Sequence, residues 1–238
     1  HVNNPEVIFS INYDGLKTQT YGGTTFLIHA AVGGSMPVSY YGINGGWGGM
    51  RVTKSFVSLF PADGSDKRGR FYTDGQTLEI NDLSNFKNGY GFTKYRNIRF
   101  SDGKAGSDTT GNFVDADIPF FRLGDVYLMY AEATLRGGNG NMASALQYVN
   151  ALRARAGATP VVSMNLDFIL SERGREMSWE MTRRSDLIRF GKFTGSSYLW
   201  AWKGGAKDGA AVPEYRNLFP IPTNDIIANA NLVQNPGY

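Results

Sequence analysis

Three glutamates spaced four residues apart are the side chains whose arrangement most resembles a reactive group. Glu172, Glu176 and Glu180 lie in the stretch SERGREMSWEMTRRSDLIRFGK, residues 171–192. A helix over this stretch would place them along one face, as a metal site or acid–base pair would require. Arginines within one turn of every glutamate would keep all three carboxylates ionised. We therefore interpret the ladder as an internal ion-pair network.

The same stretch predicts one long helix. Its apolar side chains fall on a narrow stripe that should face a core: Leu170, Met177, Met181 and Ile188. Oppositely charged residues stand at helical spacing in three pairs: Glu172 with Arg175, Glu180 with Arg184, and Asp186 with Arg189. We assign four arginines to the internal network: Arg173, Arg175, Arg183 and Arg184.

Other reactive groups are scarce. The chain has no cysteine and only two histidines, His1 and His29, which excludes thiol chemistry and a histidine-rich zinc site. A serine triad would depend on His29, which we expect instead at the end of a buried strand. Neither a G-x-S-x-G motif nor a phosphate-binding loop occurs in the sequence.

An acidic turn resembles the opening of a calcium loop. The turn opens with Asp63-Gly64-Ser65-Asp66, but Lys67 and Arg68 occupy the fifth and sixth positions, where a ligand and a glycine are needed. The two aspartates are also the only carboxylate pair in a loop suited to a glycosidase. We expect neither a metal nor a cofactor.

The composition is that of a globular chain with long loops. Of its 238 residues, 42% are hydrophobic, and no apolar run reaches the roughly 18 residues of a membrane helix. The formal charge is only +3 and no basic stretch is interleaved with aromatics, so nucleic-acid binding is not supported. The 30 glycines and 13% of aromatic residues favour ordered loops that carry exposed rings.

The first half predicts loops with short strands. In chain order we expect strands at residues 6–13 and 24–29, a glycine-rich loop at 30–50, a strand at 92–98 and a polar loop at 101–117. Thr53 is a candidate N-cap of a short helix that ends at Pro61. Because the chain opens on a strand without a start methionine, we expect it to be part of a longer protein.

The second half predicts helices. Residues 121–136 and 142–156 should form two antiparallel helices joined by a short glycine loop. This is a hairpin of tetratricopeptide length, and one such hairpin cannot bury both its faces, so we expect further repeats in the full protein. Residues 191–212 predict an irregular loop, and a helical turn is expected near residues 225–228.

Four blocks of the second half resemble, in order, the SusD/RagB family of nutrient-binding outer-membrane lipoproteins of Bacteroidetes. They are FFRLGDVYLMYAEA at 120–133, ALQYVNALRARAG at 145–157, the charged stretch at 171–192, and the closing LFPIPTNDIIANANLVQNPGY. The first half adds NPEVIFSI, GGWGGMRVTKSFVSLF and FTKYRN. The resemblance spans essentially the whole chain.

The resemblance implies a mainly α, tetratricopeptide-like scaffold with long loop and short-strand excursions. Residues 1–238 would be the C-terminal part of one SusD-like domain whose N-terminal repeats are missing. Residues 1–118 would be a loop- and strand-rich excursion, and residues 119–238 the hairpin, the charged helix and the closing segment.

The resemblance also implies a function. Such proteins sit at the cell surface, anchored in the outer membrane by a lipidated N-terminal cysteine that is absent from this chain. They capture an oligosaccharide, or in some cases a peptide, and deliver it to a SusC-like TonB-dependent transporter. Neither catalysis nor a cofactor is implied.

The family has no fixed binding motif, so candidate contacts come from chemistry. A sugar presents an apolar C–H face edged by hydroxyls, which aromatic rings and polar side chains together can hold. The glycine-rich loop offers three rings and two polar partners: Tyr40, Tyr41 and Trp47, with Asn44 and Arg51.

Trp200 and Trp202 form a second candidate set, with Lys203 and Arg216 as possible rim residues. A purely structural role remains an alternative for Trp47 and for this pair. Three other functions stay open: a peptide-capturing member of the same family, a glycoside hydrolase, and a tetratricopeptide adaptor that binds a partner's peptide.

Overall fold

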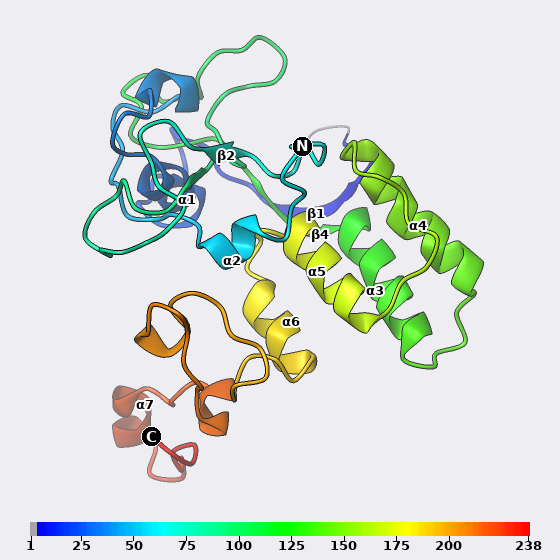
Figure 1. Ribbon diagram of the computed structural model, residues 1–238. Coiled ribbons are helices and arrows are strands. Elements are labelled where there is room, and N and C mark those ends of the chain that lie inside the picture. The colour runs from blue at the N-terminus through cyan, green and yellow to red at the C-terminus, as the bar shows by residue number, and fades with distance from the viewer. Residues whose placement is uncertain (1–3) are drawn as a thin grey trace. The chain divides into compact units, whose positions relative to one another are not determined.

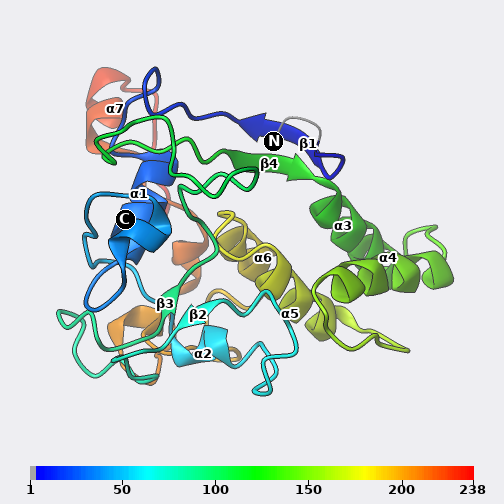
Figure 2. The ribbon, with the colours of Figure 1, turned by 90° about the horizontal axis from the view of Figure 1, so that it is seen from above.

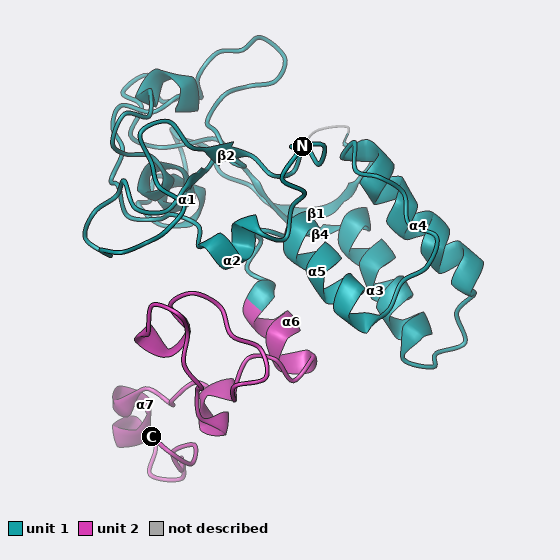
Figure 3. Ribbon diagram, in the orientation of Figure 1, with its two compact units in different colours: residues 1–183 teal, residues 184–238 magenta. Residues whose placement is uncertain are grey.

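The computed structural model describes residues 4–238, so His1 lies outside the described part of the chain. The chain divides into two compact units, residues 1–183 and residues 184–238, which Figure 3 colours separately. No helix of the described residues is long and apolar enough to cross a membrane.

Three helices of the first unit pack together: α3 (Leu123–Leu135), α4 (Met142–Arg155) and α5 (Leu166–Glu176). α3 packs against both of the others (Figure 1). Asn141 and Asn165 cap α4 and α5, since each side chain accepts a hydrogen bond from a backbone N–H three residues further on. The predicted hairpin is confirmed, and these side chains are fully buried: Leu128, Ala131, Ala145, Val149 and Ile169.

A two-stranded ribbon leads into these helices. β1 (Val7–Ile11) pairs antiparallel with β4 (Ile118–Arg122), and Figure 2 shows β4 running directly into α3. Beyond the ribbon, the Tyr13 N–H donates to Asp117 Oδ1 at 2.9 Å. The strand predicted at residues 6–13 is confirmed. The helix predicted from residue 121 begins two residues later, because residues 121 and 122 complete β4.

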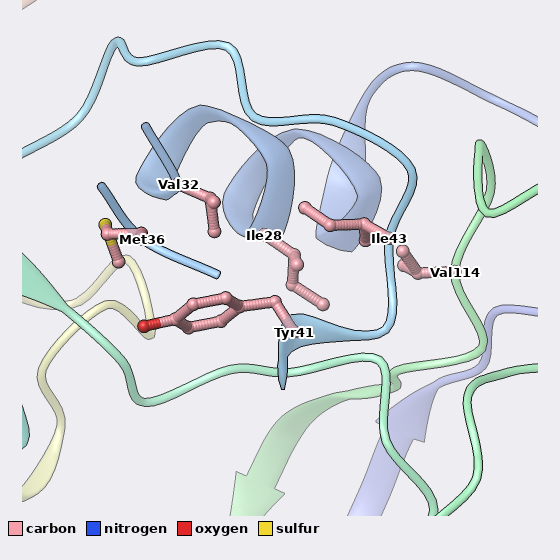
Figure 4. Packing of buried hydrophobic residues seen from close by; sticks show 6 residues of the cluster. All are labelled: Ile28, Val32, Met36, Tyr41, Ile43 and Val114. Atoms are coloured by element: carbon pink, nitrogen blue, oxygen red, sulfur yellow. The ribbon is translucent and has the colours of Figure 1, made fainter. Parts of the chain in front are cut away.

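The residues between the two strands fold around a core of their own. They include α1 (Gly23–Ala31) and the 3-10 helix η1 (Val38–Tyr41). The strand predicted at residues 24–29 is wrong, because buried side chains recur there at helical spacing: Thr24, Thr25, Ile28 and His29. Figure 4 shows the core beside α1, formed by Ile28, Val32, Met36, Tyr41, Ile43 and Val114.

The remaining elements of this excursion are short. α2 (Lys54–Val57) confirms the helix predicted after Thr53, although the Thr53 side chain makes no capping hydrogen bond. β2 (Phe71–Tyr72) pairs antiparallel with β3 (Gly91–Phe92). The strand predicted at residues 92–98 is wrong beyond its first residue, because Lys94 and the residues after it turn to bond groups elsewhere in the unit.

The single long helix predicted at residues 171–192 is wrong. α5 ends at Glu176 and α6 spans Arg183–Arg189. Between them, Trp179 and Met181 adopt left-handed backbone conformations, with φ of 59° and 62°. Met181, expected on a buried stripe, is 67% exposed, whereas Met177 is buried as predicted.

The second unit consists mostly of loops. Besides α6, which enters it at Arg184, its short helices are η2 (Lys203–Gly205), η3 (Glu214–Asn217) and α7 (Thr223–Ala228), the last of which confirms the helical turn predicted near residues 225–228. Arg184 donates to the carbonyls of Arg216 and Asn217 and lies 3.9 Å above the Phe219 ring. Its predicted place in the carboxylate network is therefore wrong, since it holds the closing segment instead.

Candidate ligand-binding site

A group of aromatic rings lies exposed on the excursion of the first unit. Tyr21, Phe26 and Trp47 are 63%, 45% and 44% exposed, and Phe113 is partly buried beside them. The Trp47 ring centroid lies 6.2 Å from that of Tyr21 and 6.1 Å from that of Phe26, and Phe113 lies 5.1 Å from Tyr21. We call these four rings the aromatic platform. Neighbouring planes are tilted by 56°, 58° and 42°, so no two neighbouring rings are coplanar.

His29 holds Trp47 in place. The buried His29 ring stacks on the Trp47 indole at 4.9 Å with an interplanar angle of 23°. The backbone N–H of Trp47 donates to the His29 carbonyl at 2.8 Å, and His29 Nδ1 lies 2.7 Å from the Gly45 carbonyl oxygen. Because a carbonyl can only accept, Nδ1 carries the proton of this hydrogen bond. Gly46 is required here, since a Cβ would lie 2.2 Å from the Val32 carbonyl oxygen.

Two amides flank the platform. Asn44 Nδ2 donates to Asn112 Oδ1 at 2.6 Å, and the Asn44 N–H donates to the Gly111 carbonyl at 3.1 Å. These contacts join the loop that carries Trp47 to the loop that carries Phe113. Asn44 Oδ1 and Asn112 Nδ2 have no protein partner among residues 4–238. The site therefore combines flat apolar rings with hydrogen-bonding groups at its edge.

The structure separates the residues that the sequence singled out. Tyr40 is 54% exposed, and the Arg96 guanidinium covers its ring at 4.3 Å. Tyr41 is only 2% exposed, and burial raises the pKa of its phenol to about 12. Arg51 donates to the carbonyls of Asn88, Gly49, Leu83 and Asn85. Tyr41 is thus a core residue, and the Arg51 side chain holds loop segments together through their carbonyls. We therefore place neither residue in the ligand-binding site.

Trp200 and Trp202 belong to the second unit and are both partly buried. The Lys203 ammonium lies 4.6 Å from the Trp200 ring and donates to the carbonyls of Gly195 and Tyr198. Lys203 is 1% exposed, so its predicted place on a rim is wrong. Trp202 has a left-handed backbone with φ of 69° and precedes η2. These contacts favour a structural role for the pair.

Three members of the platform were not predicted from the sequence. Tyr21 and Phe113 stand in polar loops, and Phe26 falls in the segment interpreted as a strand. The helical spacing of the buried residues in α1 is the signal that would have placed Phe26 on the outer face.

The glutamate ladder is an ion-pair network, as predicted. Glu172 is fully buried and binds three guanidinium groups, those of Arg68, Arg153 and Arg175. Glu180 pairs with Arg122 at 2.7 Å and with Lys94, instead of with Arg184. These partners come from distant parts of the first unit, so the network ties the excursion to the helices.

Glu176 is the centre of this network. It pairs with Arg122, Arg155 and Arg68, and its side chain is 2% exposed. Burial alone would raise the pKa of its carboxyl, but Arg122, then Arg155 and Arg68, outweigh that effect and lower the pKa to about 2. A carboxylate held so firmly in its charged form is unsuited to proton transfer.

The turn at residues 63–68, which resembles the opening of a calcium loop, contributes to the same ion-pair network. Both oxygens of the buried Asp66 accept hydrogen bonds from Arg68 at 2.9 and 2.7 Å. Burial tends to raise the pKa of Asp66, but Arg68 outweighs it and lowers the pKa. Within residues 4–238, no group of three or more His, Cys, Asp or Glu side chains is arranged to hold a metal ion.

Two comparisons of the sequence with known proteins point to the same family. A sequence model described as the SusD family matches residues 73–238. The chain is 35% identical, over an alignment of 279 residues, to the starch-binding protein SusD of Bacteroides thetaiotaomicron, covering 98% of this chain and 49% of that protein. The chain spans about half the length of the relatives it matches.

Solved structures agree with this assignment. Surface glycan-binding protein A from Bacteroides thetaiotaomicron is 25% identical with a TM-score of 0.67, covering 97% of this chain and 52% of that one. A SusD superfamily protein from Parabacteroides distasonis is 25% identical with a TM-score of 0.65, covering 99% of this chain and 50% of that one. The mainly α fold predicted from the sequence is thereby confirmed. The chain belongs to the SusD family.

Proposed function

We propose that this chain binds an oligosaccharide on the aromatic platform. The observation that carries the proposal is the grouping of three exposed rings, Tyr21, Phe26 and Trp47, beside two amides with free hydrogen-bonding groups. The rings match the C–H face of a sugar, and the amides match its hydroxyls. Since His29 fixes Trp47 before any ligand arrives, little conformational entropy is lost on binding.

The tilt between the rings of the platform favours a glycan whose successive sugars are not coplanar. Planes tilted by 56° and 58° on either side of Trp47 cannot all lie against one flat ribbon of sugars. A chain that turns from one sugar to the next can present a face to each ring. Two relatives are named for glucans: SusD as a starch-binding protein, and a surface glycan-binding protein A solved in complex with laminarihexaose.

Isothermal titration calorimetry with maltoheptaose and laminarihexaose tests the proposal. Trp47→Ala should weaken binding by about tenfold or more, as removal of a central aromatic contact does. Phe100→Ala is the matched control, because this fully exposed ring lies outside the platform and its loss should leave affinity unchanged. Equal affinity in the wild type and Trp47→Ala would exclude the platform as the site.

The alternative ligands and reactions give different results in the same samples. Peptide binding without glycan binding would favour a peptide-capturing member of the family. We expect no glycan cleavage, because Asp66 of the only carboxylate pair suited to a glycosidase is already paired with Arg68. Product formation from the bound oligosaccharide would contradict a pure binding role.

We further propose that the chain is the C-terminal part of a lipid-anchored, cell-surface protein that delivers its ligand to a SusC-like TonB-dependent transporter in the outer membrane. The N-terminal portion of the same protein would complete the scaffold. An apolar patch on the β1–β4 ribbon supports the proposal that an N-terminal portion covers this chain. Its residues are each more than half exposed: Ile8, Phe9, Phe120 and Phe121. In a full-length protein, these four residues should be protected from solvent. Hydroxyl-radical footprinting that labels them as strongly as in the 238-residue chain would contradict this.

A further inference from the structure

A cavity of about 370 Å³ opens in the first unit, where the β1–β4 ribbon meets the ends of α4 and α5. Its lining is dominated by charge. Seven cationic side chains and three carboxylates face it: Lys67, Arg68, Arg70, Lys94, Arg122, Arg155 and Arg175, with Glu6, Glu176 and Glu180. The ionised groups of the lining therefore carry a positive excess, and low-dielectric walls strengthen the field of such an excess.

The other five cations of the lining are already neutralised. Glu6, Glu176 and Glu180 pair with Arg122, Arg155 and Lys94. Behind the lining, Asp66 and Glu172 pair with Arg68 and Arg175. These ion pairs, which we call the floor of the cavity, form a network in which each of the five carboxylates has a cationic partner among the described residues.

Two cations at the mouth are not neutralised. Lys67 and Arg70 are both exposed, and the Lys67 ammonium has no partner among residues 4–238. The only hydrogen bond of the Arg70 side chain in the described structure runs from Nε to the Lys67 carbonyl, at 3.4 Å. Both terminal nitrogens of Arg70 remain available. A guanidinium with two free N–H groups can bind a carboxylate in a planar, two-pronged geometry, with an ammonium adding a second charge.

We propose that this cavity binds the carboxylate of a small organic acid, held by Arg70 and Lys67. The volume is that of a small-molecule site. The ligand's anion supplies the charge that the lining lacks, and the ion pairs of the floor keep Glu176 and Glu180 from repelling it. This site uses none of the platform residues, so it does not depend on the proposed glycan function.

The test is a calorimetric and NMR titration of the 238-residue chain with three probes. D-glucuronate and glutarate carry carboxylates on a sugar ring and on an open chain, and D-glucose is the neutral control. We expect saturable binding of at least one acid and none of glucose at this site. The acid that binds identifies the source of the carboxylate. Affinity should fall as salt is raised, since the contacts lie at the mouth.

Variants locate the site. Arg70→Gln and Lys67→Gln should each weaken acid binding by about fivefold, as loss of an exposed charge pair does. Both residues are exposed, so neither change should alter folding. Weaker acid binding by either variant alone is enough to place the acid in this cavity. Lys87→Gln removes one exposed charge outside the cavity and should have no effect. Absence of saturable acid binding, or equal weakening by Lys87→Gln, would overturn the proposal.

Discussion

Replacing Glu176 by glutamine should make the stability of the first unit less dependent on pH. The pKa of Glu176 is lowered from its usual 4.5 to about 2, chiefly because Arg122 outweighs the effect of burial. A difference of this size corresponds to about 3 kcal/mol of unfolding free energy. The contribution is complete above the unfolded pKa and is lost as pH falls towards the folded pKa. Glu176→Gln should therefore be about 3 kcal/mol less stable near pH 6 and about as stable as the wild type near pH 2.

Urea unfolding, followed by far-UV circular dichroism at several pH values, measures this difference. Urea is preferable to guanidinium because it adds no ions that would screen the charges. Glu79→Gln is the control, since its ion pair with Lys54 is about half exposed and should contribute only about 0.5 kcal/mol. A stability difference that stays constant from pH 6 to pH 2 would refute the role assigned to the charge. So would a variant more stable than the wild type at neutral pH, as can happen when a buried ion pair is replaced.

Three further perturbations have defined outcomes. His29→Phe keeps a ring beneath Trp47 but leaves a loop carbonyl unpaired, so it should weaken glycan binding by about fivefold in calorimetry; unchanged affinity would show that stacking alone positions the indole. Asn165→Ala should destabilise the chain by about 1 kcal/mol in thermal unfolding, whereas Thr53→Ala should change little because its side chain caps nothing. The raised pKa of Tyr41, about 12, means that stability falls as pH rises from about 10 to 12. Ultraviolet absorbance should therefore show this phenol ionising only with alkaline unfolding, and early ionisation of every tyrosine would contradict its burial.

The charged stretch shows how far sequence reasoning carries. The alternation of acidic and basic residues in this stretch correctly predicts an ion-pair network around Glu172, Glu176 and Glu180. It does not reveal that Arg122 and Arg68 are partners of Glu176, because these residues are 54 and 108 positions away in the sequence. Arg122 also donates to the Glu176 carbonyl at 2.8 Å, at the residue where α5 ends although local periodicity predicts an uninterrupted helix. Tertiary contacts override helical pattern at this point.

The binding site shows a similar limit. The sequence offers Trp47 as one candidate ring of the glycine-rich loop, but it leaves a purely structural role open for this indole. Its neighbours in the platform come from three separate segments, and only the fold of α1 brings Phe26 to the surface beside it. Tyr41 follows Tyr40 directly, yet one ring is exposed and the other buried. Residue type and loop composition could not separate the two, because the difference arises from the core around Ile28 and Val114.

The β1–β4 ribbon gives the excursion a single point of entry and exit. Tyr13 and Asp117 are 104 positions apart in the sequence, yet they are joined by a hydrogen bond. Doubling the length of a loop held in this way costs only about 0.6 kcal/mol of closure entropy. Insertions and replacements within residues 13–117 can therefore accumulate at little entropic cost, provided that they keep Arg68 and Lys94, which pair with Glu172, Glu176 and Glu180. The ribbon is a natural grafting boundary, across which evolution or an engineer could exchange one ligand specificity for another.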